Sequence, residues 1–283
     1  MSRVAIVTDS ASDLPPEAAA AAGIEVVPLV VSFGSQTFKA GVELSTAEFW
    51  RRMTAPDAPF PTTAASAPGD FKATYERLFA AGADAIVSVH VAGTLSGTIK
   101  SAEIARGMLA NRDIRIVDSG SASMGQGILA QIGAEMAGRG ATADEIAATL
   151  EARKADLDLY VALDTLAYLK KGGRISGAQA AIGTLLSVKP IITIRGGLVH
   201  TADKPRTRGK ARERVLELLT QRPIERLAVL YGPPADGEAF RREAIQRLAG
   251  KLDPGRVSIQ PIGPSVGPHV GPGCVGGVVL YAH

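Results

Sequence analysis

Residues 3–13 read Arg-Val-Ala-Ile-Val-Thr-Asp-Ser-Ala-Ser-Asp, and this stretch decides the fold class. The apolar run at 3–8 has the length and the β-branched content of a buried strand. It is followed at once by small polar residues, which are typical of a turn at a strand end. A short apolar strand that ends in a polar loop is the first half of a βαβ unit, which predicts that strands and helices alternate along the chain.

The same alternation continues through the first half of the sequence. Further strands are predicted at residues 25–31, 84–91 and 114–118. Helices are predicted at residues 70–81, 96–110 and 142–155. We expect Ser96 to be the N-cap of the second helix, and Thr142 and Glu145 to form a capping box at the third. Strands that alternate with helices in this order predict a parallel sheet.

A second series of elements begins near residue 157. Strands are predicted at residues 159–163, 188–194, 198–201, 226–231, 257–261 and 278–281. Helices are predicted at residues 165–171, 208–219 and 235–248. The fold class is therefore α/β, with an N-terminal parallel-sheet domain at 1–157 and a smaller C-terminal α/β domain at 158–283.

Composition excludes several classes of protein. Apolar residues make up 46% and charged residues 21%, so the chain can build a core. The 31 basic and 28 acidic residues leave a net charge of only +3, and the 5% aromatic content argues against a stacking surface for single-stranded nucleic acid. The apolar runs are too short for a membrane span or a signal peptide, which predicts a cytoplasmic protein. Cys274 is the single cysteine, so no internal disulfide or cysteine-rich metal site is expected, and we predict that it is buried.

Two familiar catalytic motifs are matched only in part. Residues 271–276 spell G-x-G-x-x-G, but a strand-like run follows them, whereas a dinucleotide site requires a helix there. Residues 93–97 resemble a nucleophile elbow, but both glycines are one position away from where that turn around Ser96 requires them. Neither motif therefore predicts an enzyme.

Small hydroxyl and acidic residues gather at the predicted strand ends. They lie at residues 8–13, 62–63, 92–98 and 118–121. In a parallel sheet these loops meet at the carboxyl edge, where helix N-termini can bind a carboxylate or a phosphate. Taken one by one, Asp9, Ser12, Thr63 and Asp118 are better interpreted as turn formers and caps, whereas their joint appearance after successive strands favours a site.

Histidines and basic residues supply further candidates. His269 lies in a loop of glycines and prolines and is a candidate ligand contact, whereas His90 lies inside a strand and is predicted to be a buried core residue. Basic residues recur through 204–214, which is interpreted as a solvated helix or as a surface for phosphate or an acidic partner. Arg174 ends a second basic turn at 170–174.

The motifs together resemble the DegV family of bacterial fatty-acid-binding proteins over essentially the whole chain. The matching segments are T-D-S-x-x-D at 8–13, L-S-G-T at 95–98, V-D-S at 117–119, L-A-Y-L-K-K-G-G-R-I-S at 166–176, K-P at 189–190 and H-x-G-P-G at 269–273. The resemblance implies two α/β domains with a long-chain fatty acid in the cleft between them. It also implies a non-catalytic role, in which the protein presents the lipid to the ATP-binding subunit of a fatty acid kinase. No metal and no cofactor other than the bound fatty acid are implied.

The resemblance also assigns roles to individual positions. Thr63, Gly93, Thr94, Ser96 and His269 match the positions that contact the carboxylate, and Arg174 and Arg206 match basic residues of the phosphoryl-transfer or partner face. Two positions depart from the family pattern, since Ala64 and Gly93 stand where the family has serines. We expect backbone N–H groups of Gly93 and Thr94 to compensate.

Two other functions remain open at this point. A small-molecule hydrolase or phosphotransfer enzyme would use Ser96, His269 and Asp118. A nucleic-acid-binding protein would use residues 204–214, although the near-neutral charge balance argues against it.

Overall fold

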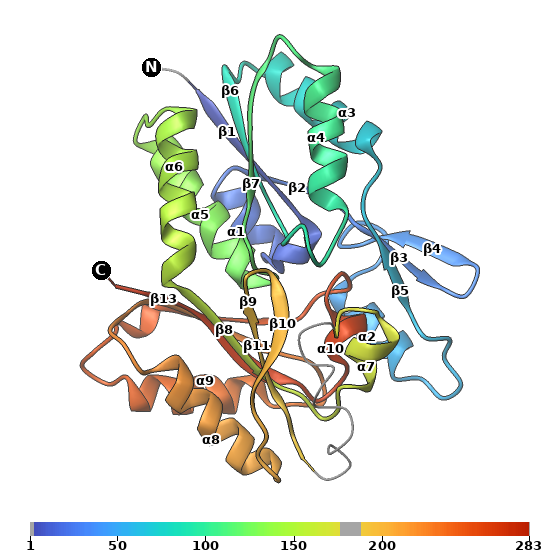
Figure 1. The fold of residues 1–283 in the computed structure, drawn as a ribbon, viewed down its shortest axis with the longest axis vertical. Coiled ribbons are helices and arrows are strands. Elements are labelled where there is room, and N and C mark those ends of the chain that lie inside the picture. Colours follow the sequence, from blue (N-terminus) through green and yellow to red (C-terminus); the bar gives the residue numbers. More distant parts are fainter. Residues whose placement is uncertain (1–2, 176–187, 283) are drawn as a thin grey trace. The chain divides into compact units, whose positions relative to one another are not determined.

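The computed structural model describes residues 3–175 and 188–282 and divides the chain into two compact units (Figure 1). Unit 1 comprises residues 1–44 and 63–155, and unit 2 comprises residues 45–62 and 156–283. The segment 45–62, which falls in the N-terminal domain of the predicted division, thus packs with the C-terminal half. Ser176, the last residue of the longest family motif, lies outside the described residues.

The centre of unit 1 is a four-stranded parallel sheet in the order β2-β1-β6-β7. Its strands are β1 (Val4–Asp9), β2 (Ile24–Val27), β6 (Ala85–His90) and β7 (Asp113–Asp118). Every residue of β6 is buried, as expected of a central parallel strand that is covered on both faces. The parallel sheet predicted from the sequence is confirmed.

Helices cover both faces of this sheet (Figure 1). The helices are α1 (Pro16–Ala21), α3 (Pro68–Ala80), α4 (Thr98–Met108), α5 (Met124–Gly138) and α6 (Ala143–Arg153). Phe71, Tyr75 and Phe79 of α3 pack into one core with residues of α4 and the sheet, while α5 and α6 lie on the opposite face. Unit 1 is therefore a three-layer α/β structure.

The helix starts follow local capping chemistry. Thr142 and Glu145 form the predicted capping box at α6. The predicted cap at Ser96 is wrong by one residue, because Gly97 is the N-cap of α4. Ser96 still serves the helix start, since its Oγ accepts a hydrogen bond from the N–H of Thr98 at 3.3 Å.

The single strand predicted at 25–31 is two strands, which belong to different sheets. β2 ends at Val27, and β3 (Val30–Phe33) pairs with β4 (Gln36–Lys39) in a small sheet of order β4-β3-β5, with β5 at Thr62–Ala64. Pro28 causes the break because it has no N–H for the ladder. The N–H of Leu29 instead donates to the Oγ of Ser10 at 2.8 Å.

Helix α5 was not predicted. Almost every residue of its first ten is buried, so it lacks the polar face that makes a helix visible as a periodic pattern. Its glycines also lower the helix propensity. Gly127 is needed for close packing, because a Cβ there would lie 2.9 Å from the backbone oxygen of Ser12.

Unit 2 is built on a six-stranded mixed sheet in the order β10-β9-β8-β13-β11-β12. Its strands are β8 (Leu157–Ala162), β9 (Ile191–Arg195), β10 (Leu198–Asp203), β11 (Ile224–Tyr231), β12 (Val257–Pro261) and β13 (Val275–Tyr281). α8 (Arg208–Leu219) and α9 (Gly237–Arg247) pack on it around a core that includes Phe240, Val229 and Leu219. β13 begins at Val275, within the G-x-G-x-x-G stretch at 271–276, so a strand and not a helix follows the motif, as predicted.

Three short helices of unit 2 lie apart from this core: α2 (Thr46–Met53), α7 (Ala167–Lys171) and α10 (Gly267–Val270). Trp50 attaches α2 to the segment after β12, since its Nε1 donates to the backbone oxygen of Ile262 at 2.8 Å. A Cβ on Gly267 would lie 2.3 Å from the ring of Phe49. These contacts explain why 45–62 belongs to unit 2.

Candidate functional site

The carboxyl edge of the unit 1 sheet has the geometry of a ligand site. β1 lies between β2 and β6, and β6 lies between β1 and β7, so the chain leaves the adjacent strands β1 and β6 toward opposite sides. Ligands of open α/β sheets bind at such a switch point. The loops that follow β1, β6 and β7, at residues 10–13, 91–97 and 119–123, gather there.

The loop at residues 91–97, here called the β6 loop, is held by three consecutive amides. The N–H of Val91 donates to Asp9 Oδ2 at 3.2 Å, that of Ala92 to the backbone oxygen of Ser121 at 2.8 Å, and that of Gly93 to Asp118 Oδ2 at 3.2 Å. The loop then turns on itself, because the N–H of Ser96 donates to the oxygen of Ala92 at 3.1 Å. Its backbone is therefore fixed before any ligand arrives.

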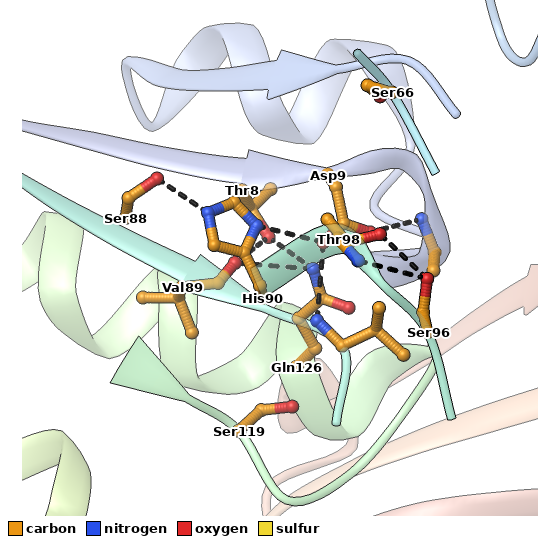
Figure 2. Close-up of polar contacts among 12 residues, drawn as sticks. Thr8, Asp9, Ser66, Ser88, Val89, His90, Ser96, Thr98, Ser119 and Gln126 are labelled. Atoms are coloured by element: carbon orange, nitrogen blue, oxygen red, sulfur yellow. Dashed lines mark hydrogen bonds and ion pairs between the residues drawn. The ribbon is translucent and has the colours of Figure 1, made fainter. Parts of the chain in front are cut away.

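Asp9 is the buried centre of this arrangement (Figure 2). Its Oδ1 accepts from the N–H of Ala11 at 2.9 Å, and its Oδ2 accepts from Val91 and lies 3.0 Å from Nδ1 of His90. Asp9 and His90 are both fully buried. Asp9 thus joins the loop after β1 to the loop after β6 across the switch point.

His90 continues the network inward, as Figure 2 shows. Its Nε2 lies 2.7 Å from the Oγ of Ser88, and the hydroxyl of Tyr75 donates to that same Oγ at 2.9 Å. We call Asp9, His90, Ser88 and Tyr75 the buried relay. Burial raises the pKa of Tyr75, so its hydroxyl keeps its proton. The prediction that His90 is a buried core residue with satisfied nitrogens is confirmed.

The connectivity Ser88–His90–Asp9 is that of a hydrolytic triad, but its surroundings are not. All three side chains are fully buried in the sheet, and Ser88 Oγ already accepts a hydrogen bond from the Tyr75 hydroxyl. A nucleophile must face the carbonyl that it attacks and an oxyanion hole. The relay has the hydrogen bonds of a triad without access to a substrate.

A second buried network ties α5 to the same strands. Nε2 of Gln126 donates to Thr8 Oγ1 at 2.8 Å, and the hydroxyl of Thr8 donates to the backbone oxygen of Val89 at 2.8 Å (Figure 2). At the start of α5, Ser123 has a φ of 54° and its hydroxyl donates to Asp13 Oδ2 at 2.6 Å. A positive φ is costly for a residue with a Cβ, and such strain is commonly found at functional sites.

The sequence-predicted contacts in unit 1 differ in their accessibility. Gly93 and Thr94 are exposed, whereas Thr63 and Ser96 are half-buried. Ser96 Oγ lies 2.8 Å from Thr98 Oγ1, so part of its hydrogen-bonding capacity is used locally. The N–H of Gly93, which we expected to bind the ligand, donates to Asp118 in this structure. Asp9 and Asp118 accept hydrogen bonds from loop amides, which agrees with their interpretation as turn formers and caps.

The remaining predicted residues, His269, Arg174 and Arg206, lie in unit 2. His269 of α10 packs against the turn after α7, where a Cβ on Gly172 would lie 2.2 Å from its Nδ1. Burial, together with the charge of Arg174, lowers the pKa of His269 to about 4. At neutral pH His269 is therefore an uncharged hydrogen-bonding group. Arg174 Nη1 donates to the backbone oxygen of Gly172 at 2.7 Å.

An aromatic cavity of about 400 Å³ lies beside α7 in unit 2. Phe60 and Tyr168 line it with their rings stacked at a centroid distance of 6.1 Å, and Nζ of Lys171 lies 5.0 Å from the Phe60 ring centre. Gly271, with a φ of 75°, brings the segment after α10 against Tyr168. The motif at 166–174 thus builds a helix and turn of which Tyr168 and Lys171 line this cavity and Gly172 lies against His269.

Three basic side chains of the segment at 204–214 form ion pairs within unit 2. Arg208 pairs with Asp164 at 2.5 Å, Arg212 with Glu243 at 2.8 Å, and Arg214 with Asp203 at 2.8 Å. The Arg208 guanidinium lowers the pKa of Asp164, as does Lys189. Arg206 is exposed. The segment is therefore not a continuous field of free positive charge.

Cys274 is buried, as predicted. Within residues 3–175 and 188–282, histidine, cysteine and acidic side chains form no group of three that could hold a metal ion. In the same residues, no helix has the length and apolar character needed to cross a bilayer.

Sequence reasoning found the loops but missed the buried relay. Ser88 and His90 are two residues apart on one strand, so their side chains point to the same face of the sheet. That spacing was a usable signal. Asp9 is 81 residues from His90, and only the pairing of β1 with β6 brings them together.

Comparison with known proteins gives the same fold and a family. Residues 3–282 match the model of the family described as "Uncharacterised protein, DegV family". A DegV domain-containing protein of Streptomyces coelicolor is 37% identical over 284 residues, which cover 99% of each chain.

Two solved structures are similar over nearly their whole length. A DegV family protein from Thermus thermophilus, described by its fatty acid binding, superposes with a TM-score of 0.90 at 34% identity and covers 99% of this chain and 100% of its own. DegV of Bacillus subtilis, described as a fatty acid binding protein, superposes with a TM-score of 0.86 at 33% identity and 99% coverage of both chains. Since these matches span both units, this chain belongs to the DegV family.

Proposed function

We propose that this protein binds a long-chain fatty acid and holds its carboxylate at the carboxyl edge of the unit 1 sheet. The observation that carries the proposal is the likeness to the fatty-acid-binding proteins of Thermus thermophilus and Bacillus subtilis over 99% of this chain. The rigid β6 loop supports it further, because a preformed polar loop at a switch point suits a small anionic head group.

The contacts that we propose for the carboxylate in unit 1 are Thr63, Thr94 and Ser96, and the family resemblance implies His269 as a further contact. Thr63 and Thr94 offer hydroxyls, and Ser96 lies at the start of α4, where helix N–H groups favour an anion. A neutral His269 would donate a hydrogen bond without adding a charge. Gly93 contributes through the shape of the loop, since its own N–H donates to Asp118. That the lipid lies between the two domains stays a prediction of the family resemblance.

Loss of the serines at Ala64 and Gly93 need not abolish lipid binding. Burying roughly fourteen methylenes at about 0.8 kcal/mol each stabilises the complex by about 11 kcal/mol before ordering costs. One hydrogen bond to a charged group contributes only about 1.5–3 kcal/mol. The tail therefore dominates affinity, and the head group determines placement.

We further propose that the bound lipid is presented to the ATP-binding subunit of a fatty acid kinase, with Arg174 and Arg206 on the partner face. The exposure of Arg206 supports this role. On this proposal the protein supplies the lipid carboxylate, and the partner supplies the nucleotide and the catalytic groups.

Neither alternative gains support from the geometry. The hydroxyl of Ser96 lies 2.8 Å from Thr98 Oγ1 and accepts the N–H of Thr98, so it is used at the start of α4, which disfavours its use as a nucleophile. The ion pairs of Arg208, Arg212 and Arg214 reduce the charge available to nucleic acid.

Mass spectrometry under denaturing conditions tests the proposal directly. Protein purified without added lipid is unfolded in organic solvent, and the small molecules that it releases are identified by mass spectrometry. The mass of the same preparation under native conditions shows how many of these molecules each chain carries. We expect a long-chain fatty acid at close to one per chain. If several preparations release none, and the protein also fails to take up added palmitate, the proposal is wrong.

A further inference from the structure

We propose that Asp9 and His90 are positioning residues that hold the β6 loop in the shape that distinguishes a free carboxylate from a neutral head group. Neither side chain would touch the lipid, because both are fully buried. The inference rests on the proposed fatty-acid binding and adds to it the source of head-group selectivity.

The first step is the link between Asp9 and the loop backbone. Asp9 Oδ2 accepts the N–H of Val91, the first residue of the β6 loop, at 3.2 Å, and Oδ1 accepts the N–H of Ala11 at 2.9 Å. A carboxyl group can accept from both amides at once, whereas an amide side chain would turn an N–H group toward one of them. The position therefore requires an acid.

The second step is the orientation of Asp9 by His90. Tyr75 donates to Ser88 Oγ, so Ser88 has its own proton available for Nε2 of His90 at 2.7 Å. Nδ1 then carries the ring proton and donates it to Asp9 Oδ2 at 3.0 Å. Tyr75 is the donor at one end of the relay, Asp9 is the acceptor at the other, and Ser88 and His90 between them each donate once and accept once. This order fixes both the tautomer of His90 and the direction of the Asp9 carboxyl group.

The third step is the consequence for the ligand. Ala92 and Gly93 continue the held backbone directly after Val91, and Thr94 and Ser96 project from the loop that they define. A carboxylate gains from polar groups only if they are already aimed at it, because their reorganisation would offset the gain. The binding of a neutral ester of the same chain length depends on burial of its tail, so disorder of the β6 loop affects its affinity little.

Three substitutions separate positioning from simple stability. Asp9→Asn places an amide N–H either against the N–H of Ala11 or against both the N–H of Val91 and Nδ1 of His90. His90→Gln reaches toward Ser88 but loses the donor to Asp9, whereas His90→Asn places an amide N–H near the position of Nδ1 and keeps that donor. Leu150→Ala is the matched control, because it removes a fully buried side chain of α6 without touching the relay or the loop.

Two measurements are made on each full-length, delipidated variant. The first is affinity for palmitate and for methyl palmitate, which share a tail and differ in the head group. The second is hydrogen exchange of the amides of residues 91–97, which reports on loop order without any ligand. We expect Asp9→Asn and His90→Gln to lower the palmitate-to-ester preference on the order of tenfold and to speed loop exchange. His90→Asn and Leu150→Ala should retain both wild-type values.

The outcomes distinguish the inference from the proposed function. If the wild-type protein binds neither probe, fatty-acid binding is wrong, and loop exchange alone decides whether Asp9 and His90 hold the loop. If the wild-type protein prefers palmitate but the folded Asp9→Asn or His90→Gln variant keeps that preference, positioning by the relay is overturned. Equal losses in His90→Asn and His90→Gln also overturn it, because the bond to Asp9 would then be irrelevant.

Discussion

Gly93 is one of the two residues, with Ala64, that stand where the family resemblance implies a serine. A Cβ at this position would lie 3.2 Å from Asp118 Oδ2 and 3.4 Å from Cδ1 of Ile99. These contacts are tight but not prohibitive, since a shift of a few tenths of an ångström would relieve them. The backbone at residue 93 therefore does not require glycine, and the lack of a side chain there means only that the loop has one hydroxyl fewer.

Gly93→Ser is expected to tighten palmitate binding by about tenfold. A new hydroxyl directed at the carboxylate would add about 1.5–3 kcal/mol, of which a part is offset by the shift of Asp118. Gly69→Ser in α3 is the control, because nothing lies within 4 Å of its Cβ position. Calorimetric titration with palmitate gives the dissociation constants of both variants and of the wild-type protein for comparison. Unchanged or weaker binding by Gly93→Ser would mean that the new hydroxyl does not reach the head group.

At the scale of elements, the turn after α7 depends on two glycines for different reasons. Gly173 has a φ of 72°, a conformation that is costly for any residue with a Cβ. Gly172 has an ordinary helical φ of −75°, but a Cβ there would lie 2.2 Å from Nδ1 of His269. The adjacent glycines thus provide backbone freedom at one position and space at the other.

Gly172→Ala is expected to displace the ring of His269 and to lower the free energy of unfolding by about 1–3 kcal/mol, as overpacking does in a core. It should also weaken palmitate binding more than methyl palmitate binding. Gly107→Ala in α4, where nothing lies within 4 Å of the Cβ, should instead stabilise by roughly 0.5–1 kcal/mol. Denaturant unfolding compares the two. A Gly172→Ala protein as stable as the wild type would show that His269 does not need this space.

For the whole molecule, His269 couples stability to pH. Its pKa is lowered from 6.5 to about 4 in the folded chain. Between these values the unfolded state binds a proton that the folded state does not, so stability rises with pH through this window. The contribution is complete above about 6.5 and is lost as the pH falls to about 4, a change of about 3 kcal/mol.

His269→Gln should flatten this part of the profile. We expect the delipidated wild-type protein to lose stability relative to the variant as the pH falls from 6.5 to 4, measured by urea unfolding at a series of pH values. Subtracting one stability profile from the other removes the contributions of other titrating groups, such as Asp164, whose pKa is lowered from 3.8 by Arg208. Parallel profiles for the two proteins would contradict the low pKa of His269.

Much of the fold could be predicted because its signals are local. The capping box at Thr142 and Glu145 and the bounds of α8 at 208–219 depend on residues a few positions apart. The parallel order of β1 and β6 followed from alternation of strands and helices. The start of α4 was missed by one residue, because Ser96 and Gly97 are both suited to the helix start. The break at Pro28 was missed because the apolar run continues through it, although proline has no N–H for the strand ladder.

The sequence by itself determined the α/β class, the polar strand ends and the family. Tertiary structure alone decided that α5 is a buried helix, that residues 45–62 pack with unit 2, and that Asp9 meets His90. The physical reason is the distance along the chain. Trp50 and Ile262 are 212 residues apart and Asp9 and His90 are 81 apart, so neither hydrogen bond leaves a local pattern. Burial in the assembled sheet makes an isolated acid and an isolated histidine into one positioned pair.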